Sequence, residues 1–323
     1  MKQTTNVKKL QPLQNELEKY RGKSVFFESL HGNNGDKLIE MGSREMLRRM
    51  EVNLVTDPSL SEVIICNGGA GMTDIWVHGF QTLKYYNSVY PHIPLVILPS
   101  SFLFTKTYFP SLFSGRIAPA FIYAREPYSL SVLQNLNFPT EVHLGIDHDM
   151  AFHLENSEYI DKLQLAQKHI LIVERNDPES VTSTYTATQP SLIKKSKYIP
   201  KTVKRSIRRH ILTPLKHMAV LNSLGVGANT TFAQECLTQV WHDYPQLQNL
   251  PVVAVDISNP DLCSFHTFSK LIAEAAVVVA TRLHVGILGA MLDKPTYIKS
   301  GSYHKIRGIY EHSLQDKQNA RLI

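Results

Sequence analysis

The residues with the clearest capacity for chemistry lie in the segment 280–292, ATRLHVGILGAML. There a buried apolar run ends in Thr281, Arg282, Leu283 and His284, and an apolar helix follows at once. An arginine and a histidine are costly inside a core without partners, so we expect both at the helix N-terminus, which attracts anions. An imidazole there can donate or accept a proton near neutral pH. The segment predicts an anion site with acid–base capacity, and the alternative is a structural arginine beside a capping threonine.

A second group of polar residues follows the first predicted strand, in HGNNGDKLI at 31–39. Asn33, Asn34 and Gly35 tolerate tight backbone conformations, and Asp36 is placed to cap the next helix. The backbone amides of this loop could face an anion. The alternative interpretation is an ordinary strand–turn–helix junction.

Further candidates follow other predicted strands, because ligands of parallel sheets bind beyond the carboxyl ends of the strands. The glycine-rich segment NGGAGMTD at 67–74 predicts a turn, but it matches neither a GxGxxG fingerprint nor a Walker loop. The remaining candidate substrate-binding residues are Gly68, Gly69, Ser100, Arg125, Arg175, Tyr303 and Lys305.

These residues need elements to position them, and the sequence alternates apolar runs of strand length with amphipathic runs of helix length. The predicted strands are 24–30, 62–66, 94–101, 120–124, 140–144, 169–174, 251–256, 276–281 and 295–300. Such alternation requires crossover connections and a parallel sheet buried on both faces. The alternation pauses near 153–168 and restarts. We therefore predict an α/β fold of two Rossmann-like, doubly wound domains facing a cleft, 1–155 and 156–323, with a basic insertion near 190–212.

Composition narrows the classes of function. The 323 residues carry a net charge of +6, which favours anionic partners. The three cysteines are far apart and in no CxxC spacing, so we interpret them as buried thiols of a reducing compartment and expect no metal site. The N-terminal residues lack the apolar core of a signal peptide, and the most apolar stretch, 271–292, is interrupted by charges. We expect a soluble, cytoplasmic protein.

A basic run at 194–210 contains eight Lys or Arg among seventeen residues. One interpretation is a solvated charged face or loop. The other is a surface that meets anionic lipid at the inner face of the membrane, or an anionic acceptor. Nucleic acid is not an expected partner, because aromatic residues are not interleaved with the charges.

At these segments the chain resembles the polysaccharide pyruvyltransferase family. The resemblance covers residues 31 to 311 and rests on these segments in the family's order: GNNGD (32–36), NGGAG (67–71), LPSS (98–101), AREPYS (124–129), DHDMAF (147–152), TRLHVGIL (281–288) and SYHK (302–305). One segment departs from the family, since GGAGMTD stands where a GGGN-type sequence is more usual.

The resemblance implies a fold like that of GT-B glycosyltransferases, with the acceptor side in the first domain and the donor side in the second. It implies transfer of pyruvate from phosphoenolpyruvate to a hydroxyl pair of a sugar or lipid-linked oligosaccharide, which forms a ketal in exopolysaccharide, capsule or cell-wall biosynthesis. The family's donor-site motif falls on Arg282, Leu283 and His284. By residue type, Arg175 and Lys305 are further donor contacts, and Asp36 is a candidate base. No cofactor beyond the donor substrate is expected.

Two alternatives accompany this expectation. One is a GT-B glycosyltransferase that uses a nucleotide-sugar donor. The other is a non-catalytic polysaccharide-assembly protein that keeps the fold without the activity; the presence of Arg282, His284 and Lys305 disfavours it.

Overall fold

The computed structural model describes residues 10, 12–30, 32–76, 78–175 and 230–323. The basic run at 194–210 and the expected insertion near 190–212 lie outside these residues. The chain divides into two compact units. Unit 1 comprises Met1–Gly32, Asp36–Ser157 and Tyr303–Asp316, and unit 2 comprises Asn33–Gly35, Glu158–Ser302 and Lys317–Ile323.

Unit 1 is built on a seven-stranded, entirely parallel sheet in the order β2-β1-β3-β5-β6-β7, with β4 pairing β5 outside this path. Its strands are β1 (Ser24–Glu28), β2 (Asn53–Val55), β3 (Val63–Cys66), β4 (Gly69–Thr73), β5 (Leu95–Leu103), β6 (Ala120–Ala124) and β7 (Val142–Ile146). Its helical segments are α1 (Leu13–Leu17), η1 (Glu18–Tyr20), α2 (Asn34–Arg49), η2 (Pro58–Leu60), α3 (His78–Val89), η3 (Phe109–Phe113), α4 (Pro127–Gln134), η4 (Met150–Leu154), α11 (Lys305–Ile309) and η7 (Tyr310–Leu314).

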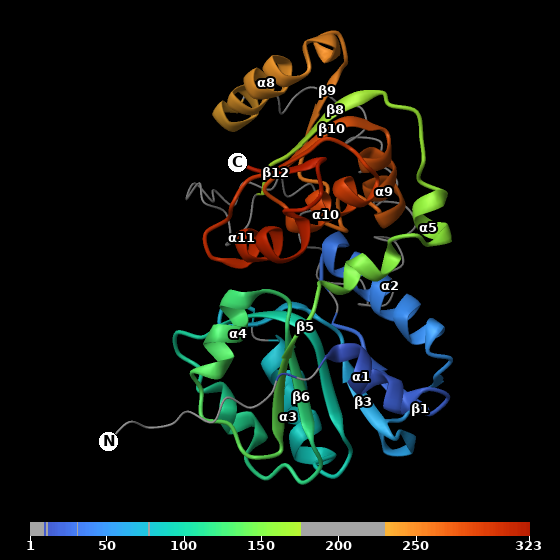
Figure 1. Cartoon of the computed structure of the whole chain (residues 1–323), viewed down its shortest axis with the longest axis vertical. Coiled ribbons are helices and arrows are strands. Elements are labelled where there is room, and N and C mark those ends of the chain that lie inside the picture. Colours follow the sequence, from blue (N-terminus) through green and yellow to red (C-terminus); the bar gives the residue numbers. More distant parts are fainter. Residues whose placement is uncertain (1–9, 11, 31, 77, 176–229) are drawn as a thin grey trace, which may run out of the picture. The chain divides into compact units, whose positions relative to one another are not determined.

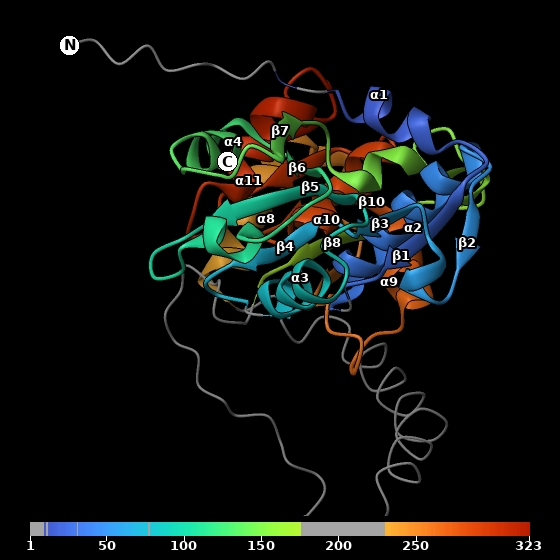
Figure 2. The ribbon, with the colours of Figure 1, turned by 90° about the horizontal axis from the view of Figure 1, so that it is seen from below.

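Both faces of this sheet are covered, as a fully buried parallel strand requires. Successive residues of β3 show the division, because Val63 and Ile65 join one core cluster and Ile64 joins the other. Helices α1 and α2 pack on the first face, and α3, η3 and α4 pack on the second. Figure 2 shows α1 and α3 on opposite sides of the strands. The unit is therefore doubly wound.

Unit 2 repeats this plan with a five-stranded parallel sheet in the order β12-β11-β10-β8-β9 (Figure 1). Its strands are β8 (His169–Val173), β9 (Val252–Ala254), β10 (Ala275–Ala280), β11 (Thr296–Ile298) and β12 (Ala320–Leu322), and its helical segments are α5 (Glu158–Asp161), α8 (Thr231–Asp243), η6 (Pro245–Leu247), α9 (Phe265–Ala273) and α10 (Leu283–Met291). Helix α10 lies close on the sheet because a methyl group at Gly286 or Gly289 would press into β11 side chains, at 2.8 Å from Ile298 and from Thr296 Oγ1 respectively.

The alternation of strands and helices is confirmed as two parallel, Rossmann-like α/β sheets. One local prediction is wrong. The glycine-rich segment predicted as a turn forms β4, which pairs with β5 through an irregular register between Gly69 and Met72. The short edge strands β2 and β12 were not predicted, because three-residue strands carry too little apolar pattern to be recognised.

The segment Tyr303–Asp316 differs from the predicted division of the chain. The prediction placed it in the second domain, whereas the structure groups it with unit 1. Tyr128 Oη of α4 donates a hydrogen bond of 3.0 Å to Glu311 of this segment, and Gly308 lies so close to α4 that a methyl group there would be 2.8 Å from the Tyr128 ring.

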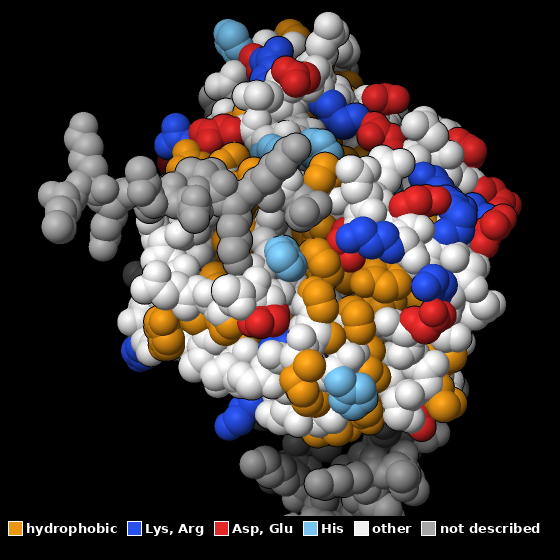
Figure 3. Space-filling view, turned by 60° about the horizontal axis from the view of Figure 1, so that its bottom comes forward, with side chains coloured by type: hydrophobic (Ala, Val, Ile, Leu, Met, Phe, Trp, Pro, Cys, Tyr) orange, Lys and Arg blue, Asp and Glu red, His pale blue; other side chains and the backbone are white. Residues whose placement is uncertain are grey.

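The described surface has two notable features. Most exposed large hydrophobic side chains belong to unit 1, among them Leu60, Tyr85 and Ile117. Figure 3 shows hydrophobic side chains gathered on one face, with charged residues of both signs around them. No helix within the described ranges is long and apolar enough to cross a membrane.

Candidate functional site

The strand orders locate the expected ligand positions. Renumbered within each unit and with β4 set aside, the strands follow the doubly wound order 2-1-3-4-5-6 in unit 1 and 2-1-3-4-5 in unit 2. In this order the strand sequence reverses between the first and third strands, and ligands bind outside the carboxyl ends at that point. The candidate positions are therefore the ends of β1 and β3 in unit 1, and the ends of β8 and β10 in unit 2.

In unit 1 this position is occupied by Asn67, directly after β3. Its backbone N–H donates to Glu28 O at the end of β1 (2.9 Å), and its Oδ1 accepts from Ser43 Oγ (2.7 Å). The side chain is fully buried, and its Nδ2 has no hydrogen-bond partner among the described residues. Asn67 is a polar residue of this edge that sequence reasoning missed, although it begins the glycine-rich segment.

Asp36 lies at the same edge, in the first turn of α2. The Asp36 carboxylate lies against Gly32, where a methyl group in place of the glycine hydrogen would overlap it. A methyl group at Gly69, whose φ is +137°, would lie 3.7 Å from Asp36 Oδ1. The predicted site residues Asp36 and Gly69 are therefore neighbours, and the two glycines give the carboxylate room.

The loop Asn33–Gly35 groups with unit 2, and Asn34 attaches it there. The Asn34 side chain is buried and its Nδ2 donates to Ile257 O (2.9 Å) and Cys263 O (3.0 Å). Its backbone N–H donates to Ser258 O at 2.9 Å. These hydrogen bonds attach the loop to unit 2, and they occupy both the side-chain NH2 group and the backbone N–H of Asn34.

Gly35 brings His284 to this loop. A methyl group at Gly35 would lie 2.6 Å from His284 Nδ1, so only glycine admits the imidazole at this distance. The Gly35 N–H donates to Asn33 Oδ1 at 2.7 Å, which closes a tight turn. His284, in the first turn of α10, is therefore adjacent to the loop that the sequence singled out.

Thr281 joins the two sides of the reversal point in unit 2. Its Oγ1 accepts a hydrogen bond of 2.6 Å from the Arg175 backbone N–H, just beyond β8, and donates to Val173 O at 3.4 Å. Arg175 and Thr281 are therefore brought together, as their positions after β8 and β10 predicted. The threonine hydroxyl thus links the ends of β8 and β10, and Arg175 is half-buried.

Arg282 precedes α10 and is only 8% exposed. Its Nε donates to Asp256 Oδ1 (3.1 Å) and its NH2 donates to Asp256 Oδ2, so one carboxylate binds the guanidinium at two points. Asp256, just past β9, was missed, although an acidic residue closing an apolar strand was a usable signal. Leu283 is buried in α10 and packs in the core.

Three predicted substrate-binding residues are buried and contact other parts of unit 1. Arg125 is fully buried, with NH1 2.7 Å from Asp149 Oδ2 and Nε donating to Ser101 Oγ at 2.9 Å. Ser100 is fully buried and donates to Leu98 O at 2.8 Å. Gly68 lies against the backbone of Pro99, where any side chain would collide with the carbonyl. Each is used to assemble the sheet edge.

Tyr303 and Lys305 belong to unit 1, whereas the sequence placed them at the sheet edge that carries Arg282. Lys305 is 5% exposed, and its Nζ lies 5.1 Å from the centre of the Tyr303 ring. This distance is that of a cation–π contact.

Sequence reasoning also missed a polar group where Tyr303–Asp316 meets α4. His304 Nε2 lies 3.4 Å from Ser129 Oγ and 3.5 Å from Oε1 of the fully buried Glu126. Nearby, the ring of His312 stacks on that of His148 at 4.8 Å. Burial, together with the neighbouring His148, lowers the pKa of His312. The signal was present as His and Glu in SYHKIRGIYEH, but their packing against α4 depends on the fold.

The edge of unit 2 thus gathers an arginine held by a carboxylate, a second arginine, a threonine and a histidine beside the N-terminus of α10. Such a set suits an oxyanion that is held by guanidinium groups and helix amides, with an imidazole able to move a proton. Among the described residues no group of three or more His, Cys, Asp or Glu side chains is arranged to hold a metal ion.

Comparison with known proteins supports the fold and gives no information on function. No family model matches the sequence, and no curated protein matches it. The structure is similar to the crystal structure of a functionally uncharacterized protein from Klebsiella pneumoniae subsp. pneumoniae, with a TM-score of 0.59 and 16% sequence identity over 97% of this chain and 99% of that one. At this identity the likeness concerns the fold.

Proposed function

We propose that this protein is a transferase that moves pyruvate from phosphoenolpyruvate to a pair of sugar hydroxyls in a polysaccharide precursor. The observation that carries the proposal is the grouping of Arg282, Thr281 and His284 at the carboxyl edge of the unit 2 sheet, beside the N-terminus of α10. Phosphoenolpyruvate holds a phosphate and a carboxylate close together, which suits planar guanidinium donors and helix amides. The family resemblance of the sequence supports the same substrate.

The proposed chemistry needs one proton delivered and two removed. Protonation of the methylene carbon makes C2 of the donor cation-like, and a sugar hydroxyl attacks it. Phosphate leaves and the second hydroxyl closes the ring, so one hydroxyl proton replaces the proton given to carbon and the other leaves with phosphate. His284 is the proposed proton donor, because an imidazole exchanges protons near neutral pH. Asp36 is the proposed base.

The proposal includes the GT-B-like arrangement of the two units that the family resemblance implies, with unit 1 on the acceptor side. The proposed partners are phosphoenolpyruvate and a sugar or lipid-linked oligosaccharide acceptor. The proposed location of the protein is the cytoplasm. Peripheral contact with anionic membrane is proposed for the basic run at 194–210, which lies outside the described residues.

Calorimetric titration with phosphoenolpyruvate tests the donor site. We expect Arg282→Ala to weaken binding by roughly 2–5 kcal/mol, typical for one partner of a desolvated charge pair. Arg282→Ala also leaves the Asp256 carboxylate without its two-point partner, which should destabilise the protein. The double variant Arg282→Ala/Asp256→Ala separates this effect from binding, because we expect it to be more stable than Arg282→Ala and still to bind phosphoenolpyruvate weakly. Arg321→Ala, at an exposed pair on β12, is the control and should bind normally. Unchanged donor affinity in Arg282→Ala contradicts the proposal.

Phosphate release with candidate sugar acceptors tests the proton transfer. His284→Gln should lower turnover by roughly 10²–10⁴-fold while donor affinity changes less. Near-normal turnover at saturating donor rules out this role for His284. Parallel titration with nucleotide-sugars tests the alternative GT-B glycosyltransferase, which predicts tight nucleotide-sugar binding and none of phosphoenolpyruvate.

A further inference from the structure

Unit 1 contains a buried arginine that lacks a carboxylate partner among the described residues. Arg116 is 6% exposed; NH1 donates to Asn87 Oδ1 at 3.0 Å, NH2 donates to Ile93 O, and Nε has no hydrogen-bond partner. Burial lowers the pKa of Arg116 to about 10, so the group stays charged at neutral pH. A buried charge whose partners are all neutral is costly, and a nearby anion would offset that cost.

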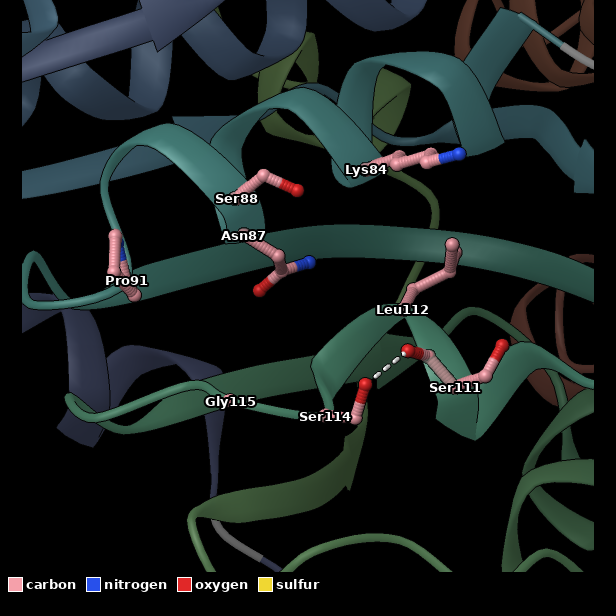
Figure 4. A pocket seen from close by; sticks show the side chains of 8 residues that line it. All are labelled: Lys84, Asn87, Ser88, Pro91, Ser111, Leu112, Ser114 and Gly115. Atoms are coloured by element: carbon pink, nitrogen blue, oxygen red, sulfur yellow. Dashed lines mark hydrogen bonds between the residues drawn. The ribbon is translucent and has the colours of Figure 1, made fainter.

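A pocket of about 490 Å³ is lined by residues that include a hydrogen-bond partner of this arginine, although Arg116 itself is not among the lining residues. Asn87 is the link, because it lines the pocket and also accepts the hydrogen bond from Arg116. Figure 4 shows Lys84, Asn87 and Ser88 of α3 on one side and residues 111–115 on the other. None of the eight lining residues is acidic, and Lys84 adds a second positive charge. The volume is in the range of small-ligand pockets.

Two serines on the opposite wall offer oxygen atoms that accept hydrogen bonds. Ser111 Oγ donates to Tyr108 O at 2.7 Å, and Ser114 Oγ donates to Ser111 O at 2.9 Å (Figure 4). Each hydroxyl proton is used by the backbone, and the lone pairs remain. The pocket therefore combines positive charge on one side with acceptors on the other, which suits an anion that also carries hydroxyl groups.

The pocket belongs to the opposite edge of the sheet from the candidate site. Its lining residues Pro91 and Gly115 precede β5 and β6, and the N–H groups of Ile117 and Ala118 donate to Pro91 O at 3.0 and 2.9 Å. This is the amino-terminal edge, whereas Asn67 and Asp36 lie at the carboxyl edge. A ligand here would be separate from the proposed reaction.

We propose that this pocket binds a small hydroxylated anion, a sugar phosphate or a sugar acid, with its charged group toward Lys84 and Arg116 and its hydroxyls toward Ser111 and Ser114. The anionic group supplies the counter-charge that the Arg116 guanidinium lacks in the described part of the chain. The hydroxyl groups account for the two serine acceptors. This inference does not depend on the proposed transferase activity.

Titration calorimetry on the full chain tests the proposal with glucose 6-phosphate and glucuronate as hydroxylated anions, inorganic phosphate as charge alone and glucose as hydroxyls alone. We expect one or both hydroxylated anions to bind more tightly than either single-feature probe, and the better of the two shows whether phosphate or carboxylate is preferred. Equal affinity for glucose and for the hydroxylated anions overturns the proposal, as does no binding of either anion.

Variants locate the binding. Lys84→Gln should weaken the preferred anion by about fivefold, the upper range for an exposed charge pair, and Lys84→Glu should weaken it further because it repels the ligand. Both changes are at an exposed side chain, so folding should be unaffected. Lys270→Gln, an exposed lysine on α9, is the matched control. Binding that is unchanged in Lys84→Glu, or that is lost in Arg282→Ala instead, refutes this location.

Discussion

The buried pair Arg125–Asp149 gives a strong prediction about stability. Both side chains are at most 1% exposed, and NH1 lies 2.7 Å from Asp149 Oδ2. Asp149→Asn keeps the size of the side chain and an oxygen that can accept from the Ala151 N–H, as Asp149 Oδ1 does at 2.9 Å. It removes the charge and replaces Oδ2, which accepts from Arg125 NH1, with an amide NH2 group that only donates, so the Arg125 guanidinium loses its buried counter-ion. We expect unfolding of unit 1 to become easier by about 3–5 kcal/mol, the usual cost of breaking a buried pair.

The two tryptophans allow the assay to be specific for unit 1, since Trp76 is in unit 1 and Trp241 in unit 2. Urea unfolding followed by fluorescence in a Trp241→Phe background therefore reports on the unit that contains the pair. The double variant Arg125→Met/Asp149→Asn should lose less stability than the sum of the single variants, because no unpaired charge is left in the core.

Glu18→Gln is the matched control, because Glu18 forms an exposed ion pair with Arg21 in the same unit. Exposed pairs contribute little to stability, so we expect no resolvable change in the urea midpoint. If Asp149→Asn has as small an effect as Glu18→Gln, the interpretation of Arg125 as a structural residue is wrong, and a substrate-binding role is again open.

Two further predictions concern titration and thiol reactivity. Burial lowers the pKa of His169, whose Nε2 lies 2.9 Å from Leu271 O. Because the unfolded chain then binds more protons, the free energy of unfolding should fall as the pH drops below about 6.5. Between pH 7.5 and 5.5 the urea midpoint should fall less in His169→Gln than in the native protein, and an equal fall would contradict this prediction. Burial raises the pKa of all three thiols: that of Cys66, that of Cys236 to about 11 and that of Cys263 to about 12. A thiol reagent at pH 8 should therefore label none of them quickly in the native protein and all three in urea. Fast labelling of any one thiol in the native protein would contradict the buried positions.

Much of the fold could be predicted because its signals are local. Strand β3 is buried on both faces, so its residues are uniformly apolar and readable without knowing their neighbours. The prediction failed where local pattern and pairing disagree: Gly69–Thr73 has the composition of a turn, yet it pairs with β5. Backbone pairing satisfies the polar groups of a segment whatever its side chains, and this gain is not visible in composition.

For the candidate site, the sequence by itself determined that Thr281, Arg282 and His284 stand between a buried strand and a helix, because the chain must leave the core at that point. Only the tertiary structure decided which groups meet there. Asp256, just past β9, pairs with Arg282, although β8 lies between β9 and β10 in the sheet. Gly35, distant in the chain, lies against His284. The tertiary structure also buried Arg125 in the core of unit 1 and packed the segment Tyr303–Asp316 against α4. A side chain's residue type shows what it can bind, whereas its actual partner depends on which distant segments the packing brings within reach of a hydrogen bond.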